Sequence, residues 1–280
     1  MEDKRGKLYI CATPIGNLED ITIRVLNTLK EVDLIAAEDT RHTLKLLNHY
    51  EINRPLTSYH EHNRAKKGPE LMGKLLQGKR IALVSDAGMP GISDPGEDMV
   101  KLCIENDIEI EVLPGASAVL TALVASGLSS QKFSFEGFLD RHKKRRRERL
   151  KRIKTEDRTL IFYESPHRLI DMLKDMREIL NDRPMVAARE LTKKYEEIIR
   201  GYISHIIDYF LDNPPRGEFV LLVEGADVED SNNKGFEELT IEEHIVLYMN
   251  KGLSKKESVK EVAKERNISK REVYKHSIEI

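Results

Sequence analysis

The stretch "IALVSDAGMPGISDPGEDMV", residues 81–100, decides the fold because its character changes sharply in the middle. Four apolar residues come first, and the next twelve include three glycines, two prolines, two aspartates and two serines. A short apolar run is typical of a strand buried on both faces of a parallel sheet. The glycines then permit close approach to bare backbone, and the prolines stiffen the chain. We therefore predict a buried strand that ends in a rigid, ligand-ready loop.

On both sides of this stretch, strand-like and helical segments alternate. In the first part we predict strands at 8–13, 33–39, 80–86 and 110–115, with amphipathic helices at 21–32, 68–78 and 96–107. This series is typical of an α/β fold with a mainly parallel sheet. After a helical segment at 116–127, we predict a mixed sheet with strands at 132–139, 158–165, 184–191, 196–204 and 217–225, and helices near 142–154, 166–180 and 204–212.

The chain therefore divides into four parts. We expect an N-terminal α/β domain (1–116), a second α/β domain (117–225), a polar linker (226–238) and a small helical domain (239–280). In the helical domain, Ser254 and Ser269 each precede a glutamate by three residues, which predicts two capping boxes. The last two helices fit a helix-turn-helix, and we expect this domain to recognise RNA. A helical hairpin that merely packs on the body is the alternative.

Composition predicts a soluble, cytoplasmic protein. The 280 residues include 46 basic and 48 acidic ones, and no apolar run approaches the roughly 18 residues of a membrane span. The first residues contain no signal-peptide pattern. Cys11 and Cys103 lie in apolar segments and are expected to be buried in a reducing compartment.

One segment departs from this neutral balance. "RHKKRRRERLKRIK", residues 141–154, holds ten Lys or Arg and one acid. A solvated helix face is one interpretation. We favour RNA binding, because phosphates would relieve the repulsion and release counterions. The predicted RNA-binding residues are Arg141, Lys143, Lys144, Arg145, Arg146, Arg147 and Arg149, with His167 and Arg168 nearby in a second polar cluster.

Three loops follow predicted parallel strands and are rich in small residues: 12–17, 85–96 and 113–118. Ligands in open α/β sheets bind at such strand ends. Ordinary turn chemistry is the alternative for each loop. The phosphate-binding motifs G-x-G-x-x-G and G-x-x-x-x-G-K-[ST] are missing, and so is any metal-ligand spacing. We expect a ligand held by strand-end backbone, and no metal.

Six segments in this order resemble the tetrapyrrole methylase family of S-adenosylmethionine-dependent methyltransferases, in particular its branch that acts on small-subunit ribosomal RNA. They are "YICATPIGNLEDIT", "AAEDTRHTLKLLNHY", "SDAGMPGISDPG", "LPGASAVLTAL", "FEGFLDRHKKRRRERL" and "FYESPHRL". The porphyrin branch carries a glycine-rich run after its first strand, and "ATPIGN" replaces it here. The substitution favours the RNA branch.

The resemblance implies two α/β domains with S-adenosyl-L-methionine in a cleft between them, and a homodimer. It implies methylation of the ribose 2′-oxygen of a cytidine in 16S ribosomal RNA, position 1402 in the usual numbering. It places the cofactor contacts on Pro14, Asp86, Ala87, Gly88, Met89, Ile92, Ser93, Pro114, Gly115, Ala116, Ser117, Ala118, Phe162 and Tyr163.

Methyl transfer from a sulfonium requires alignment and exclusion of water. A ribose hydroxyl is a poor nucleophile, so a base or a cation beside it would help. Polar clusters at two predicted strand ends supply the catalytic candidates Glu38, Arg41 and Glu164. Helix capping or surface ion pairing is the alternative for each. Rival functions are a methyltransferase of the same fold acting on a tetrapyrrole or a protein, and a ligand-sensing regulator that binds nucleic acid.

Overall fold

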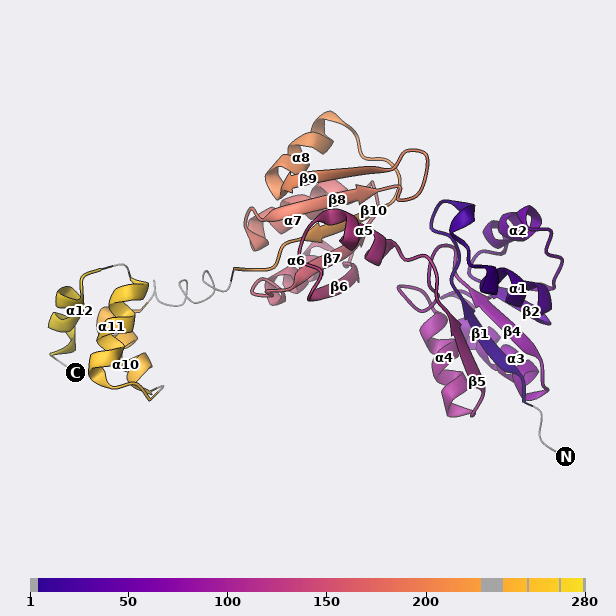
Figure 1. Ribbon diagram of the computed structural model, residues 1–280, viewed down its shortest axis with the longest axis horizontal. Coiled ribbons are helices and arrows are strands. Elements are labelled where there is room, and N and C mark those ends of the chain that lie inside the picture. The colour runs from indigo at the N-terminus through magenta and orange to yellow at the C-terminus, as the bar shows by residue number, and fades with distance from the viewer. Residues whose placement is uncertain (1–4, 228–238, 251, 267, 279–280) are drawn as a thin grey trace.

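A computed structural model describes residues 5–227, 239–250, 252–266 and 268–278. It contains two five-stranded sheets and a separate group of helices near the C-terminus (Figure 1). This architecture confirms the predicted fold class of two α/β units followed by a helical one. Part of the predicted linker, residues 228–238, lies outside the described residues. The predicted domain limits stay a prediction.

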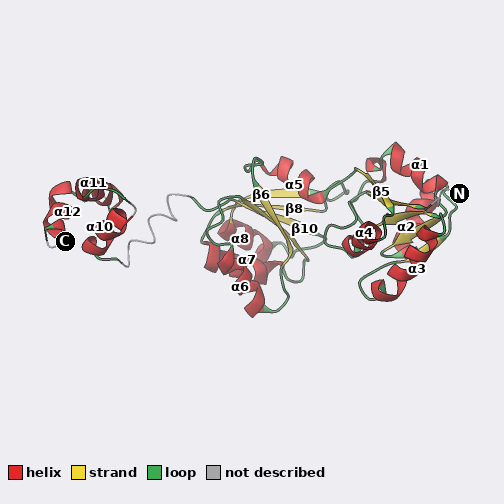
Figure 2. Ribbon diagram, turned by 90° about the horizontal axis from the view of Figure 1, so that it is seen from below, coloured by secondary structure: helices red, strands yellow, loops and turns green. Residues whose placement is uncertain are grey.

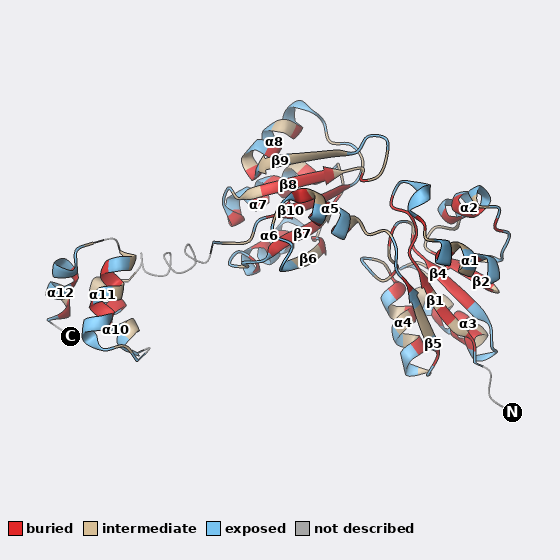
Figure 3. Ribbon diagram, in the orientation of Figure 1, coloured by how far each residue is buried: buried red, intermediate tan, exposed pale blue. Residues whose placement is uncertain are grey.

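The first sheet is entirely parallel, with the strand order β3-β2-β4-β1-β5. Its strands are β1 (Lys7–Cys11), β2 (Leu34–Ala37), β3 (Leu56–Ser58), β4 (Arg80–Val84) and β5 (Glu109–Leu113). The central strands are almost wholly buried, as the apolar runs predict (Figure 3). β3 was not predicted, because this three-residue edge strand is only half-buried and has no apolar run.

Helices cover both faces of this sheet. α1 (Ile23–Glu31) and α2 (Thr40–His49) pack on one face, where Val25, Leu29 and Leu46 meet Ile35 and Val84. The opposite face holds α3 (Arg64–Leu76) and α4 (Gly96–Glu105). The helices that follow β1 and β4 therefore lie on opposite faces of the sheet.

The second sheet is mixed, with the order β6-β7-β10-β8-β9. Only β6 and β7 pair in parallel, and the other neighbours are antiparallel. Its strands are β6 (Phe133–Phe138), β7 (Thr159–Glu164), β8 (Pro184–Arg189), β9 (Glu197–Tyr202) and β10 (Phe219–Val223). One face carries α6 (Lys143–Arg152), α7 (Leu169–Leu180) and α8 (Ile203–Asp212), and the other carries α5 (Ala118–Ser126), as Figure 2 shows.

The C-terminal unit consists of α10 (Ile241–Asn250), α11 (Lys255–Glu265) and α12 (Lys270–Ser277). They share a small core that includes Ile245, Val262 and Val273. The capping box at Ser254 is confirmed, because Ser254 and Glu257 cap each other's backbone. At Ser269 the structure shows half of the predicted box: the hydroxyl accepts from the Glu272 N–H at 3.2 Å. Among the described helices, none is long and apolar enough to cross a membrane.

Candidate active site

The strand order of the first sheet creates a crevice at the carboxyl ends of β1 and β4. From β1 the chain runs toward β2, and from β4 it runs the opposite way toward β5. Ligands in open α/β sheets bind where neighbouring strands diverge in this way. The loops that follow the two strands are joined, since the Thr13 N–H donates to Gly88 O at 2.9 Å and the Gly88 N–H to Thr13 O at 3.0 Å. The two loops form one floor.

The conformation of the loop after β4 explains its residue types. Gly88 has a φ of 79°, and a Cβ there would lie 3.3 Å from Ile15 Cγ2. Ser93 adopts a φ of 68°, a conformation that costs a non-glycine residue energy and that clusters at active sites and ligand clamps. Asp94 holds the loop, because its carboxylate accepts from the N–H groups of Gly91 and Gly96, each at 2.8 Å.

A cavity of about 390 Å³ lies above this floor, and both sheets line it. Its size is within the range of small-molecule sites. Nine of the predicted cofactor residues line it: Asp86, Ala87, Gly88, Met89, Ile92, Ser93, Ser117, Ala118 and Tyr163. The loop after β4 therefore lies along this cavity, and its contact with a ligand stays a prediction.

Five predicted cofactor residues do not line the cavity. Phe162 needs correction: it is fully buried on the other face of the second sheet, in the core with α6, α7 and α8. Adjacent residues of a strand point to opposite faces, so only Tyr163 of this pair can face the cavity. The others, Pro14, Pro114, Gly115 and Ala116, lie in the loops beside it without forming its wall. At Gly115 a Cβ would lie 2.7 Å from Ala12 Cβ, so glycine permits the close packing of these loops.

Much of the wall that the second sheet supplies was not predicted. The antiparallel β10 brings Phe219 beside Glu164, so the start of one strand joins the end of another at the cavity. No motif in the sequence signals that pairing. Ile15, Ser85 and Asp94 line the cavity from the predicted ligand loops 12–17 and 85–96, and Ser165 from the polar cluster after β7. The lining residues that were missed are Phe138, Pro166, Ala188, Glu190, Leu191, Lys193, Glu218, Phe219 and Val220.

Glu38, at the end of β2, lies beside other acids. Its Oε2 is 3.5 Å from the Asp86 N–H, and Asp86 Oδ1 accepts from the Asp39 N–H at 2.9 Å. Burial, and then the nearby Asp86 carboxylate, raise the pKa of Glu38. Acids crowded in a partly buried cavity wall favour a cationic ligand, which relieves their repulsion.

Glu164, at the end of β7, is more deeply buried, with 1% of its surface exposed. Its Oε1 accepts from the Ser165 N–H at 2.8 Å and lies 3.3 Å from Arg168 Nε. Its Oε2 is buried and has no hydrogen-bond partner among the described residues. Burial raises the pKa of this carboxyl. A buried acceptor that lacks a donor marks a place where a ligand can supply one.

Arg41 does not reach the cavity, which corrects its prediction as a catalytic residue. Its side chain is 89% exposed and pairs with Asp39 at 2.8 Å. Asp39 also caps α2, since it accepts from the Arg41 N–H at 2.8 Å. This pairing lowers the pKa of Asp39. The capping and ion-pairing alternative holds for these two residues.

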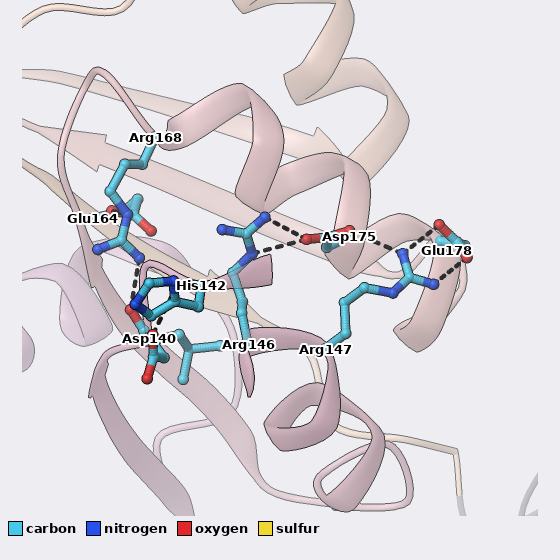
Figure 4. A network of polar contacts seen from close by, with 9 residues as sticks. Asp140, His142, Arg146, Arg147, Glu164, Arg168, Asp175 and Glu178 are labelled. Carbon is cyan, nitrogen blue, oxygen red and sulfur yellow. Dashed lines mark hydrogen bonds and ion pairs between the residues drawn. The ribbon is translucent and has the colours of Figure 1, made fainter. Parts of the chain in front are cut away.

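Acids that lie close in space and distant in sequence pair with some of the arginines of the basic helix α6 (Figure 4). Arg146 is buried and pairs with Asp175 of α7 at 2.5 Å. Arg147 contacts both Asp175 and Glu178. Arg146 is therefore unavailable to RNA, and its prediction as an RNA-binding residue was wrong.

Three more of the predicted RNA-binding cations have partners. Arg145 lies 3.4 Å from Asp140, Arg149 lies 2.6 Å from Glu136, and Arg168 pairs with Glu164 while donating to Leu139 O at 2.6 Å. The exposed residues Arg141, Lys143, Lys144 and His167 have no carboxylate partner among the residues that the structure describes. No cluster of His, Cys, Asp or Glu within the described ranges could hold a metal ion.

Fold and site together define a class. The sequence model of the family described as Tetrapyrrole (Corrin/Porphyrin) Methylases matches residues 7–207, and this chain belongs to that family. Solved structures share the fold. They include cobalt precorrin-4 methyltransferase (TM-score 0.61, 18% identity, 78% of this chain and 94% of that chain) and diphthine synthase (TM-score 0.61, 13% identity, 79% and 90%).

Within the family, the chain is similar over nearly its full length to proteins named ribosomal RNA small subunit methyltransferase I. The protein of that name from Bacillus subtilis is 52% identical over 271 residues, which cover 96% of this chain and 93% of the relative. The one from Synechocystis is 47% identical, with 98% of each chain covered. The predicted resemblance is confirmed.

Proposed function

We propose that this chain is an S-adenosylmethionine-dependent methyltransferase that methylates the ribose 2′-oxygen of a cytidine in 16S ribosomal RNA of the small ribosomal subunit. The observation that carries the proposal is the cavity between the two sheets, with its open loop backbone and its unpartnered carboxylate oxygen. The relatives that share about half of their residues with this chain are named ribosomal RNA methyltransferases, and these names support ribosomal RNA as the substrate.

The residues present suit S-adenosylmethionine. Its positive charge is attracted by the carboxylates of Glu38 and Asp86 in the cavity wall. Its hydroxyl and amino groups can donate to strand-end acceptors, and Ile15, Leu191 and Val220 offer apolar surface. The cofactor residues proposed from the resemblance remain our assignment, with Tyr163 in place of Phe162.

When bound, this donor would supply an electrophilic methyl carbon to the ribose oxygen. The proton of the ribose hydroxyl then needs an acceptor. Glu38 and Glu164 are the carboxylates we assign to orient that hydroxyl and to accept its proton. Glu164 is the stronger candidate, because its Oε2 has no partner among the described residues.

We further infer that the protein acts in the cytoplasm as a homodimer, and that Arg141, Lys143, Lys144 and His167 contact the RNA backbone. These side chains are exposed beside the second sheet, at the start of α6 and α7. Phosphate contacts by such cations would make RNA affinity depend on salt.

The decisive test incubates the purified protein with labelled S-adenosylmethionine and either small ribosomal subunits or naked 16S ribosomal RNA. We expect label in the RNA, at one ribose 2′-oxygen. Mapping of methylated riboses in cells with and without the gene should show the loss of that single position. Transfer to a tetrapyrrole or a protein would replace our assignment with the first rival. Cofactor binding without transfer would favour a regulator.

A further inference from the structure

The C-terminal helices carry a second cavity that the methyl-transfer site does not use. A groove of about 360 Å³ lies between α11 and α12. Its lining consists almost entirely of cations and one aromatic ring: Lys256, Val259, Lys260, Lys270, Arg271 and Tyr274. We call it the basic groove. Lys256 and Lys260 are one helical turn apart on α11, as are Lys270 and Tyr274 on α12, so each pair shares a helix face.

The four cations of the basic groove are not held in ion pairs, since none lies within ion-pair distance of a carboxylate among the described residues. The Glu257 carboxylate acts on Lys260 from a greater distance. Nearby acids are engaged elsewhere in the same unit: Glu257 accepts from Ser254, and Glu265 accepts from the Tyr248 hydroxyl at 2.5 Å. This differs from α6, where Asp175 and Glu178 pair with Arg146 and Arg147. The start of α12, capped at Ser269, adds the positive end of a helix dipole beside Lys270.

Tyr274 gives the basic groove its second property. Tyr274 is 60% exposed, so it is open to contact with a ligand. Val259, which is 6% exposed, belongs to the core of this unit and forms an apolar part of the groove lining. An exposed aromatic ring beside cations is the combination by which proteins hold single strands, with bases stacked on rings and phosphates on Lys or Arg. Bases within a duplex are stacked on each other and cannot use such a ring.

We propose that the basic groove is a binding site for a single-stranded RNA segment, remote in sequence from the methyl-transfer cavity. An unpaired base stacks on Tyr274, and the flanking phosphates contact Lys256, Lys260, Lys270 and Arg271. The proposal rests on the proposed function in so far as the RNA is the substrate of methylation. The groove then anchors the substrate while the cavity between the two sheets performs the chemistry.

The test measures binding of the full chain to a fluorescent single-stranded RNA oligonucleotide over a range of salt concentrations. Tyr274→Ala should weaken binding about tenfold, and Tyr274→Phe, which keeps the ring, should leave it within about twofold. Lys256→Gln/Lys260→Gln should weaken binding and reduce the salt slope by about 1.4, the value for two lost phosphate contacts on a single strand. The matched control is Lys255→Gln/Lys264→Gln, which removes the same charge from the same helix outside the groove.

Three results would overturn the proposal. One is an equal loss in the control variant, which would mean nonspecific attraction. Another is unchanged affinity in Tyr274→Ala. The third is tighter, groove-dependent binding of duplex RNA or DNA.

Affinity for S-adenosylmethionine, measured by calorimetry on each variant, should not change. Because RNA binding is measured without methyl transfer, groove-dependent binding with no methylation would contradict the proposed function alone. Methylation with a groove-independent affinity would contradict this inference alone.

Discussion

Two carboxylates at the cavity, Glu38 and Glu164, differ chemically from the many surface acids of this chain. They come from different sheets, and burial raises the pKa of both. Their surroundings also differ: Glu38 lies among Asp86, Asp94 and Asp39, whereas Glu164 lies beside Arg168. Burial opposes the ionised form of Glu164, while Arg168 and the Ser165 N–H favour it. A carboxyl whose pKa is raised by burial is a stronger base than a surface carboxylate, which suits it to accept a proton.

The pH dependence of methyl transfer follows from the raised pKa values of these two carboxyls. A proton acceptor must be ionised, so activity should fall as pH drops through its pKa. Since the pKa of Glu164 is raised, the acid limb of kcat should lie above the ordinary glutamate value of 4.5. Glu164→Gln should lower kcat by about a hundredfold or more and remove that limb. Glu38→Gln serves as the comparison, with a smaller loss. An unaltered profile in Glu164→Gln would exclude it as the acceptor.

For single residues, the sequence could predict which loops border the cavity. It could predict only some of the side chains that face the cavity. Phe162 and Tyr163 are adjacent in one strand, and the pleat alone dictates that only one of them faces the cavity. Which one depends on the face of the sheet that the first domain covers. Arg41 was predicted as a catalytic cation, but its ion pair with Asp39 holds its side chain at the surface. Such local pairing depends on rotamers that the sequence does not specify.

Among the elements, α6 shows how a charge run changes meaning in three dimensions. Viewed along the sequence, its arginines have almost no acidic neighbour. In the fold, α7 lies against α6 and places Asp175 next to Arg146 and Arg147 (Figure 4). Asp175 and Arg146 are 3% and 5% exposed, so water cannot stabilise either charge well. Each charge is instead stabilised by the other. The helix is anchored by a buried ion pair as well as by Leu150 in the core.

Removing one partner of that pair should destabilise the second domain. Asp175→Ala leaves the guanidinium of Arg146 buried and unpaired, and we expect the free energy of unfolding to fall by about 3–5 kcal/mol. Chemical denaturation followed by circular dichroism measures this change. Glu178→Ala is the matched control, because Glu178 pairs with Arg147 from the exposed side of α7, and its removal should cost much less. Equal losses in both variants would contradict the role of burial.

Whether a strand could be predicted depended on how clear its pattern of apolar residues is. Buried strands such as β4 and β10 have continuous apolar runs and were found from these alone. The edge strand β3 spans three half-buried residues, too short for any pattern to emerge. The pairing of β10 between β7 and β8 is likewise invisible in the sequence, because an apolar run does not specify its neighbours. That pairing supplies much of the cavity wall.

Across the whole molecule, the loop after β1 joins the two sheets. Ile15 packs into the α5 face of the second sheet with Val186 and Leu222. The Asn17 N–H donates to Thr192 Oγ1 at 3.0 Å, and a Cβ on Gly16 would lie 2.8 Å from Leu191 O. The two domains therefore meet through loop 12–17 at the cavity itself. The order of motifs in the sequence predicts two domains. The contact between them through this loop can be seen only in the three-dimensional structure.

Since both domains form the wall, a bound methyl donor should protect both from local unfolding. Hydrogen exchange with S-adenosylmethionine at about a hundred times its Kd should reveal slower exchange in residues 85–95 and also in 186–193 and 218–223. A ligand at that concentration stabilises the bound state by about 2.7 kcal/mol, enough to slow opening of its contacts about a hundredfold. Residues 241–250 and 255–265 line neither the cavity nor its loops and serve as the internal control. Protection confined to the first sheet would place the donor on one domain alone, and the second sheet would then serve only the acceptor.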